Sequence, residues 1–221
     1  MEYVAYLVEH EKRFLIIGNV QAITYKETFP LIKADKLWMG VTIHSGDREF
    51  RVPDHYPLNA AGWRVDEDGV KYIRVKGVRW WTNLDHGRRH EKLPLMTMED
   101  NLRFSKHKEI KGKAAYDQYD NYDAIEVPFT DAIPSDHEGA MGVPITFLDR
   151  YNPDQFEILG ITDRDNNSGV KTKEYTAADV PKFGDLNRRG VVRVGNEYKP
   201  IYARLIIRHR RRSRRTRGTK K

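Results

Sequence analysis

The densest group of residues able to do chemistry spans positions 80 to 90, where the chain reads WWTNLDHGRRH. Arginine can hold a phosphate or bond the edge of guanine, asparagine can bond adenine, and tryptophan can stack on a base. The segment therefore predicts a surface that faces DNA or a base pocket. Its candidate side chains are Trp80, Trp81, Asn83, Asp85, His86, Arg88, Arg89 and His90. In the alternative interpretation one tryptophan faces the core, the other faces solvent, and the arginines are simply hydrated.

A metal site in the same segment is a second interpretation. His86 and His90 are four residues apart, beside Asp85 and Glu91, and this spacing puts two ligands on one face of a helix. A metal-dependent nuclease would use such ligands. However, the downstream Asn and His of such a motif are not found at matching spacing, and the chain has no cysteine to complete a site. We therefore predict no metal site and keep the nuclease as an alternative function.

Two further groups could face a base. Asn19 directly follows the apolar run FLIIG, and ligands of open parallel sheets gather beyond the carboxyl ends of strands. Tyr119 and Tyr122 lie in a Tyr- and Asp-rich stretch and could stack on bases. In the alternative interpretation, Gly18-Asn19 is only a tight exit from the strand, and the tyrosines fold onto the body of the protein.

The basic residues are concentrated at the C-terminus. Residues 208–221 hold seven arginines, two lysines and no acid, so their formal charge is +9. The formal net charge of the whole chain is +7, so residues 1–207 carry −2. We predict a disordered tail that binds any polyanion, with an affinity that falls steeply as salt rises. The candidate phosphate contacts are Arg210, Arg211, Arg212, Arg214 and Arg215. The alternatives are a solvated tail or an RNA-binding extension.

Composition excludes several classes of protein. The chain has no cysteine, so it has neither disulfides nor a thiolate zinc site. Its apolar runs are of strand length, as in FLIIG, against the roughly 20 residues that a membrane helix needs. No secretory signal precedes the first strand, and we expect a cytoplasmic protein without a membrane partner. With 39% hydrophobic and 11% aromatic residues, the chain can bury a core.

The pattern of apolar residues predicts the elements that must position these groups. Residues 2–12 have helical spacing, and 14–17 are predicted to form a buried strand of a parallel sheet. Residues 24–36 are predicted to form a helical connector with Pro30 in its first turn, and 37–43 to form another strand. Four short runs between 49 and 81, separated by turn residues, predict antiparallel hairpins. The stretch 97–124 is polar and lacks periodicity, so we expect an irregular excursion there. Further strands are predicted at 143–148, 156–161, 191–194 and 202–207.

Several stretches resemble the EcoRI-type adenine-specific DNA methyltransferases. They are FLIIGNVQAITYKETFPLIKADKLWMG (14–40), RWWTNLDHGRRHE (79–91), YDNYDAIEV (119–127), MGVPITFLDRYNPDQFEILG (141–160) and YARLIIRHR (202–210). The resemblance implies an α/β fold: a partial Rossmann-like methyltransferase sheet, mixed and with antiparallel hairpins, in residues 1–96. A DNA-facing target-recognition β lobe would follow in 97–207, and the basic tail in 208–221.

The resemblance also implies chemistry that this sequence does not contain. In the family, the helix matching Glu2–Lys12 follows an Asn-Pro-Pro-Phe element for the flipped adenine, and an upstream glycine-rich loop holds S-adenosylmethionine. This sequence has no Gly-x-Gly and no Pro-Pro. Asn152-Pro153 shares two letters with the tetrad but is followed by Asp154 and Gln155, which cannot supply the aromatic face that such a pocket needs.

The predicted function is therefore the DNA-binding and target-recognition portion of an N6-adenine methyltransferase, encoded by a prokaryote or a phage. Alone it would bind no cofactor and be inactive. S-adenosylmethionine would serve the complete enzyme, and the partners would be DNA and a separate cofactor-binding half. A catalytically inactive DNA-binding protein remains the first alternative and the nuclease the second.

Overall fold

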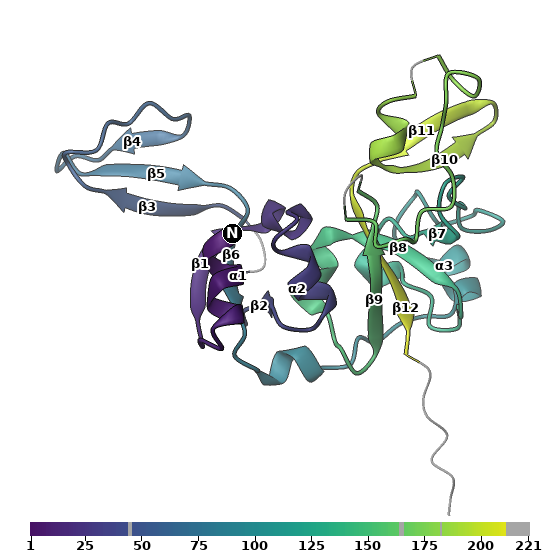
Figure 1. Ribbon diagram of the computed structural model, residues 1–221, viewed down its shortest axis with the longest axis horizontal. Coiled ribbons are helices and arrows are strands. Elements are labelled where there is room, and N and C mark those ends of the chain that lie inside the picture. Colours follow the sequence, from purple (N-terminus) through teal and green to yellow (C-terminus); the bar gives the residue numbers. More distant parts are fainter. Residues whose placement is uncertain (44–45, 164–165, 182, 211–221) are drawn as a thin grey trace, which may run out of the picture. The chain divides into compact units, whose positions relative to one another are not determined.

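The Trp-rich run Val78–Thr82 forms β6, the central strand of a three-stranded antiparallel sheet. The computed structural model describes residues 1–43, 46–163, 166–181 and 183–210. These residues divide into two compact units: Met1–Arg89 with Leu148–Arg150, and the remaining described residues from His90 onward. In the first unit, β6 lies between β1 (Leu15–Asn19) and β2 (Trp38–Met39) and is antiparallel to both (Figure 1).

The prediction that β1 is buried on both faces of a parallel sheet is wrong. β1 and β2 run in the same direction, but β6 separates them and β1 is an edge strand. Leu15 and Ile17 are 52% and 46% exposed. The strand buried on both faces is β6, where only Trp80 is half-buried. The error has a physical reason: a short apolar run shows that a strand prefers burial, but not which neighbours cover it.

The helices of the first unit follow the predicted pattern with shorter bounds. α1 (Glu2–Glu9) confirms the amphipathic helix at the N-terminus. The predicted connector is divided into a 3-10 helix, η1 (Val20–Thr24), and α2 (Phe29–Lys33), which has Pro30 in its first turn as expected. β2 covers only two of the seven residues predicted for it.

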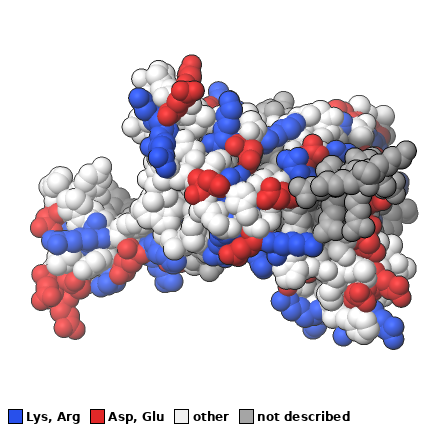
Figure 2. Space-filling view, turned by 90° about the horizontal axis from the view of Figure 1, so that it is seen from below, with Lys and Arg blue, Asp and Glu red and all other residues white. Residues whose placement is uncertain are grey.

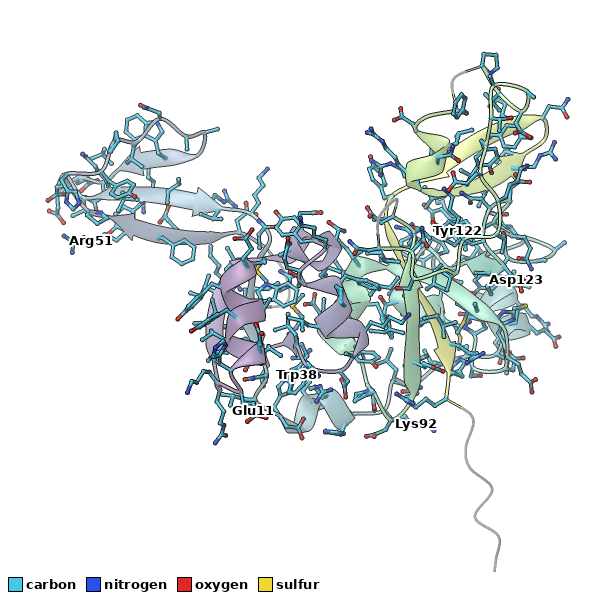
Figure 3. All side chains as sticks on the ribbon, viewed as in Figure 1. Glu11, Trp38, Arg51, Lys92, Tyr122 and Asp123 are labelled. Carbon is cyan, nitrogen blue, oxygen red and sulfur yellow. The ribbon has the colours of Figure 1, made fainter. Side chains whose placement is uncertain are left out.

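A second three-stranded sheet confirms the antiparallel pairing predicted for the first three of the four runs, whereas the fourth run forms β6 of the other sheet and does not pair with the third. Its strands are β3 (Arg48–Val52), β4 (Trp63–Val65) and β5 (Lys71–Val75), in the antiparallel order β3-β5-β4. The turn between β4 and β5 is closed by Asp66, whose carboxylate accepts hydrogen bonds from the backbone N–H groups of Asp68 and Val70. Arg51, labelled in Figure 3, lies on β3.

The second unit is built on a mixed four-stranded sheet. β7 (Ala124–Glu126) is parallel to β8 (Ala140–Pro144), which pairs antiparallel with β12 (Arg204–His209), and β12 pairs with β9 (Phe156–Ile161). A separate hairpin joins β10 (Gly190–Val194) to β11 (Glu197–Ile201). The predicted strand 143–148 ends at Pro144, because residues 145–150 form a 3-10 helix, η4 (Ile145–Arg150).

The polar stretch 97–124 contains one helix that the periodicity did not predict. α3 (Met98–Phe104) begins after Thr97, whose hydroxyl accepts from the backbone N–H of Asp100 and donates to its carboxylate. The rest of the stretch is irregular, as predicted. Three single-turn 3-10 helices complete the described elements: η2 (Gly87–His90), η3 (Thr130–Ala132) and η5 (Leu186–Arg188).

These elements confirm a mixed α/β fold with antiparallel hairpins and a mixed sheet. The mixed sheet was predicted in residues 1–96, however, and there the described sheets are antiparallel; the parallel pair, β7 with β8, lies in the second unit. No helix among the described residues is both long and apolar enough to cross a membrane. The predicted basic tail begins in β12 with Arg208, and its residues 211–221 lie outside the described part of the chain.

Candidate nucleic-acid interface

The two neighbouring tryptophans of β6 have different environments. Trp81 is 0% exposed, and its ring lies against Gly18, where an added Cβ would come within 2.7 Å of it. Trp80 is half-buried and lies on the opposite face of the sheet, packed on Gly40. Since successive side chains of a strand point to opposite faces, only Trp80 is accessible to a ligand in this structure. Trp81 acts as a core side chain.

The two asparagines of the prediction both bind backbone atoms. Asn83 accepts a hydrogen bond from the N–H of Phe14 at 3.0 Å and donates to the carbonyl of Lys12 at 2.8 Å, so it fixes the entry to β1. Asn19 fixes the exit of the same strand. Its side-chain oxygen accepts from the N–H of Gln21 at 2.9 Å, and its amide donates to the carbonyl of Lys76 at 3.0 Å. Both side chains therefore position β1.

Arg89 is buried at the end of η2 in a cluster of opposite charge and aromatic surface. It is 6% exposed, and it donates to the carboxylates of Asp35 and Asp85. Its guanidinium lies 3.7 Å from the ring centroid of Trp38, labelled in Figure 3. The sequence prediction missed Trp38 and Asp35, because they are about fifty residues away in the chain and only the tertiary structure brings them to η2. This cluster fixes the turn that carries Arg88.

His86 and Arg88 cover the outer edge of β2. His86 donates from Nε2 to the carbonyl of Met39 at 2.9 Å, and Arg88 donates to the carbonyl of Val41 at 3.2 Å. In the second unit, exposed His90 contacts the Asp154 carboxylate at 2.7 Å. Among the described residues, no three His, Asp or Glu side chains lie close enough together to hold a metal ion.

Tyr119 and Tyr122 lie in the core of the second unit. They are 6% and 2% exposed, and their rings meet edge to face. Tyr119 donates its hydroxyl hydrogen to Glu126, which also accepts two hydrogen bonds from Arg204, at 3.0 and 2.8 Å. The ring of Tyr119 lies over Gly142 and Gly190, where an added Cβ would come within 2.6 and 2.7 Å of it. Neither tyrosine presents a stacking face to solvent.

Burial shifts the ionisation of these tyrosines. Desolvation raises the pKa of Tyr119 and Tyr122 above the ordinary value, with nearby carboxylates adding to the shift. It raises the pKa of Tyr116 to about 12, and that of Tyr175 is raised for the same reason. The neutral phenol is therefore the form that the fold stabilises.

Alkaline titration should show the raised pKa of these four tyrosines. Because their pKa is raised in the folded state, the stability that they contribute is complete below about pH 10. It is lost as the pH rises through the folded value, about 12 for Tyr116. Tyrosinate absorbance should show that these four groups titrate late in the folded protein and normally in urea, and Tyr116→Phe should remove one late equivalent. Simple titration of all 12 tyrosines near the ordinary value in the folded protein would contradict this expectation.

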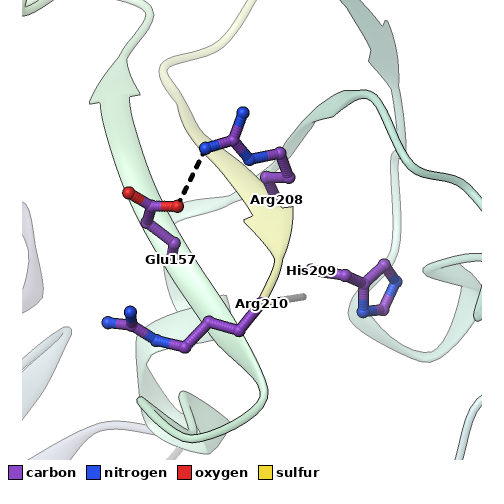
Figure 4. A pocket seen from close by; sticks show the side chains of 4 residues that line it. All are labelled: Glu157, Arg208, His209 and Arg210. Atoms are coloured by element: carbon purple, nitrogen blue, oxygen red, sulfur yellow. Dashed lines mark hydrogen bonds and ion pairs between the residues drawn. The ribbon is translucent and has the colours of Figure 1, made fainter. Parts of the chain in front are cut away.

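Arg210 is the only predicted phosphate contact that lies in the described part of the chain. Its Nε donates to the carbonyl of Pro153, and its backbone N–H donates to the carbonyl of Gln155. With Glu157, Arg208 and His209 it lines a cavity of about 360 Å³. Arg208 is paired with Glu157 at 3.0 Å, and His209 points away from both of them (Figure 4). Glu157 neutralises Arg208, whereas Arg210 donates to a neutral carbonyl and keeps its positive charge.

Charged side chains of both signs are interspersed over the visible face of the described chain (Figure 2). Several pairs explain this distribution, including Arg64 with Glu49 at 2.7 Å and Arg74 with Asp47 at 2.9 Å on the β3-β5-β4 sheet. The described surface thus agrees with a body that is nearly neutral.

The sequence comparisons identify the family. The profile described as "Adenine-specific methyltransferase EcoRI" matches residues 1–210. The chain belongs to this family of EcoRI-type adenine-specific methyltransferases.

Its relatives are bacterial enzymes. The chain is 44% identical over 168 residues to Type II methyltransferase M.EcoRI of Escherichia coli, a match that covers 74% of this chain and 48% of the relative. It is 34% identical over 163 residues to Type II methyltransferase M.MpnI of Mycoplasma pneumoniae, covering 72% and 47%. With M.MgeORF184P of Mycoplasma genitalium the identity is 33% over 210 residues, covering 93% and 59%. The chain thus spans about half the length of these relatives. No solved structure matches it.

Proposed function

We propose that this chain is the DNA-binding and target-recognition portion of a site-specific N6-adenine DNA methyltransferase of the restriction-modification or phage type. The observation that carries the proposal is the family match over residues 1–210, together with coverage of only about half of the relatives' length. Methyl transfer to DNA would then need a second half that supplies the base pocket and the methyl donor. Because its substrate is DNA, we place the protein in the cytoplasm of a bacterial cell.

The residues of this chain do not fit S-adenosylmethionine. The sequence contains neither the glycine-rich loop nor the Asn-Pro-Pro-Phe element that the family implies. The carboxyl end of β1, where an open α/β sheet would offer a site, is closed by Asn19, which occupies the N–H of Gln21 and the carbonyl of Lys76. We therefore assign the donor to the complete enzyme and derive no step through it.

Within this proposal the predicted DNA-facing residues divide into two groups by accessibility. Asp85 and His90 are exposed, and Trp80 and Arg88 are half-buried, so these side chains can reach DNA. The others are buried or bound to backbone, and they act by positioning β1, β6 and the η2 turn. The members of this positioning group are Asn19, Trp81, Asn83, His86 and Arg89.

The test is transfer of a radiolabelled methyl group from S-adenosylmethionine to duplex DNA. We expect no transfer by the chain alone. Transfer should begin when it is co-expressed with the part of the E. coli relative that precedes the matched region. Retarded migration of duplex DNA with the chain alone, at low salt, should show binding without turnover. If the chain neither binds DNA nor gains activity with the added half, the proposal is wrong, and magnesium- or manganese-dependent cleavage would support the nuclease instead.

Deletion of residues 211–221 should flatten the salt dependence of DNA binding without changing the preferred sequence. The deleted segment carries five arginines and two lysines, and each phosphate contact adds about 0.9 to the slope of log affinity against log salt. The slope should fall by at most about 6. The deletion begins after Arg210 because that residue is bonded to the loop before β9. Binding measured across a salt series on specific and random duplexes checks this, and an altered sequence preference would refute it.

A further inference from the structure

The β10-β11 hairpin of the second unit is held firmly at its base. Val191 and Val192 are 0% and 3% exposed, and they belong to two different hydrophobic clusters, one on each face of the hairpin. Buried Asn121 accepts a hydrogen bond from the N–H of Val191 and donates to the carbonyl of Arg189. The hairpin lies at one end of the four-stranded sheet of its own unit (Figure 1). Its base is therefore a rigid support for the residues beyond it.

The tip of the hairpin, residues 193–197, is exposed on both faces. Arg193 and Val194 are successive residues of β10, so their side chains point to opposite faces, and both are exposed, Val194 to 59%. Only Gly195 and Asn196 join the two strands. Gly195 has a φ of 61°, which the first residue of a two-residue hairpin turn requires. The hairpin thus ends in a narrow two-stranded ribbon with solvent on both faces.

Unpaired basic charge gathers at this hairpin. Other arginines of the unit, such as Arg204, are paired with carboxylates. Arg188, Arg189 and Arg193 form no ion pair with any residue that the structure describes. Asp120 is close enough to respond to the charge of Arg193, but its carboxylate is bound to other side chains. The hairpin therefore presents positive charge that an anionic partner can neutralise.

Arg193 is positioned by an aromatic ring. It is opposite Tyr198 in the register, and its guanidinium lies 5.2 Å from the centroid of that ring. The same arrangement recurs at the base, where the guanidinium of Arg189 lies 5.6 Å from the ring centroid of Tyr202, which is 79% exposed. A guanidinium over a ring keeps its in-plane N–H groups available for an acceptor. Both arginines are thus held in place without losing their hydrogen-bonding capacity.

We propose that the tip of the β10-β11 hairpin enters the major groove of DNA, where Arg193 and Asn196 bond the edges of bases. This inference rests on the proposed function, which makes DNA the partner. The major groove is about 12 Å wide and admits a two-stranded β-ribbon. Arginine bonds guanine through two hydrogen bonds, asparagine does the same with adenine, and an apolar side chain such as Val194 contacts the methyl group of thymine. Glu197 can accept from cytosine among the base edges, whereas it would repel phosphates.

The base of the hairpin has a different role from its tip. Arg189 is four residues before Arg193, and four residues of an antiparallel strand span roughly 14 Å. This is more than the depth of the major groove, about 8.5 Å. When the tip touches bases, Arg188 and Arg189 therefore lie outside the groove, at the level of the phosphates. There they fix the position of the hairpin on the duplex without reading its sequence.

Two substitutions remove the base contacts and keep the hairpin. Arg193→Ala and Asn196→Ala both change exposed side chains, and Gly195, which the turn requires, is left in place. Arg103→Ala is the matched control. Arg103 lies on α3 of the same unit, is exposed, forms no ion pair with a described residue, and has its guanidinium 5.0 Å from the ring centroid of Phe104. Circular dichroism and thermal unfolding of all three variants establish that the fold is kept.

The experiment mixes the full chain with DNA duplexes of randomised sequence and sequences the bound fraction. We expect the wild type to select a short motif. Arg193→Ala should lose about tenfold of its discrimination at one G·C pair, Asn196→Ala should lose as much at one A·T pair, and Arg103→Ala should select the wild-type motif. Arg189→Ala should weaken binding to every duplex alike and lower the slope of log affinity against log salt by about 0.9.

The outcomes separate this inference from the proposed function. Loss of discrimination at single positions in the two tip variants, with Arg103→Ala unchanged, supports the inference. A wild-type motif in both tip variants overturns it and leaves the proposed function standing. Equal losses in Arg193→Ala and Arg103→Ala also overturn it, because they would show an effect of charge alone. So does a wild type that binds all duplexes equally, since the hairpin lies wholly within the chain. A chain that binds no duplex at low salt would overturn the proposed function as well.

Discussion

Asp149→Ala is expected to lower the free energy of unfolding by about 3–5 kcal/mol. Asp149 accepts two hydrogen bonds from Arg79 of β6, at 2.8 and 2.9 Å, and the two side chains are only 8% and 6% exposed. Removing the carboxylate takes from the guanidinium an acceptor that binds it through two hydrogen bonds, in a site that is nearly closed to solvent. The cost of keeping that charge desolvated, and not the loss of attraction alone, produces the effect.

The measurement is urea unfolding followed by tryptophan fluorescence. All four tryptophans, at positions 38, 63, 80 and 81, lie in the first unit with this ion pair. Glu49→Gln is the matched control, since Glu49 makes the same two-bond contact with Arg64 on an exposed sheet. We expect no measurable shift of its midpoint, because water screens an exposed pair.

A double replacement separates the two contributions. In Arg79→Met with Asp149→Leu, both charges are removed and the volume is largely kept, so the loss should be much smaller than in Asp149→Ala. A loss below about 1 kcal/mol in the single variant would show that water enters the site and that the pair is not desolvated.

Glu126→Ala is expected to have an effect of similar size on the second unit, about 3–5 kcal/mol. Glu126 lies on β7 and is 6% exposed. It accepts hydrogen bonds from Arg204 of β12, across the intervening strand β8, and from the hydroxyl of Tyr119. Gly142 of β8 makes this possible: it is opposite Glu126 in the register, and an added Cβ would collide with the hydroxyl of Tyr119. The substitution removes the carboxylate acceptor from the buried hydroxyl of Tyr119 and from the guanidinium of Arg204, whose side chain is 14% exposed.

Tyr119→Phe provides the control for Glu126→Ala. It removes one neutral donor and keeps the ion pair, so it should cost only about 0.5–1.5 kcal/mol. Circular dichroism in a urea series measures both variants. If Tyr119→Phe costs as much as Glu126→Ala, the hydrogen bond from the Tyr119 hydroxyl, and not the ion pair, accounts for the loss of stability.

Local patterns were sufficient for several elements of this protein, but not for all of them. The antiparallel pairs between residues 48 and 75 follow from turn residues and alternation, which act over a few neighbouring positions. The N-terminal helix and the place of Pro30 follow from spacing and from the geometry of proline. α3 was missed because its cap, Thr97 with Asp100, precedes a polar segment without apolar periodicity.

The candidate interface shows where local reasoning stopped. The segment 80–90 has the residue types that bind DNA, but those types are also the ones that satisfy backbone carbonyls and fill a sheet. Trp38 and Asp35 decide the environment of Arg89, and Phe14 and Lys12 occupy Asn83. Such partners are more than forty residues away in the chain, so no spacing within the segment indicates them.

The sequence by itself determined the family, the segments that form helices and hairpins, the concentration of charge after residue 207 and the lack of donor-binding motifs. Only the tertiary structure decided that β6 separates β1 from β2, that Trp81 and Arg89 are buried, and that the tip of the β10-β11 hairpin is exposed on both faces. The physical reason is that strand order and burial depend on contacts between distant segments, whereas composition and periodicity report the preferences of neighbouring residues.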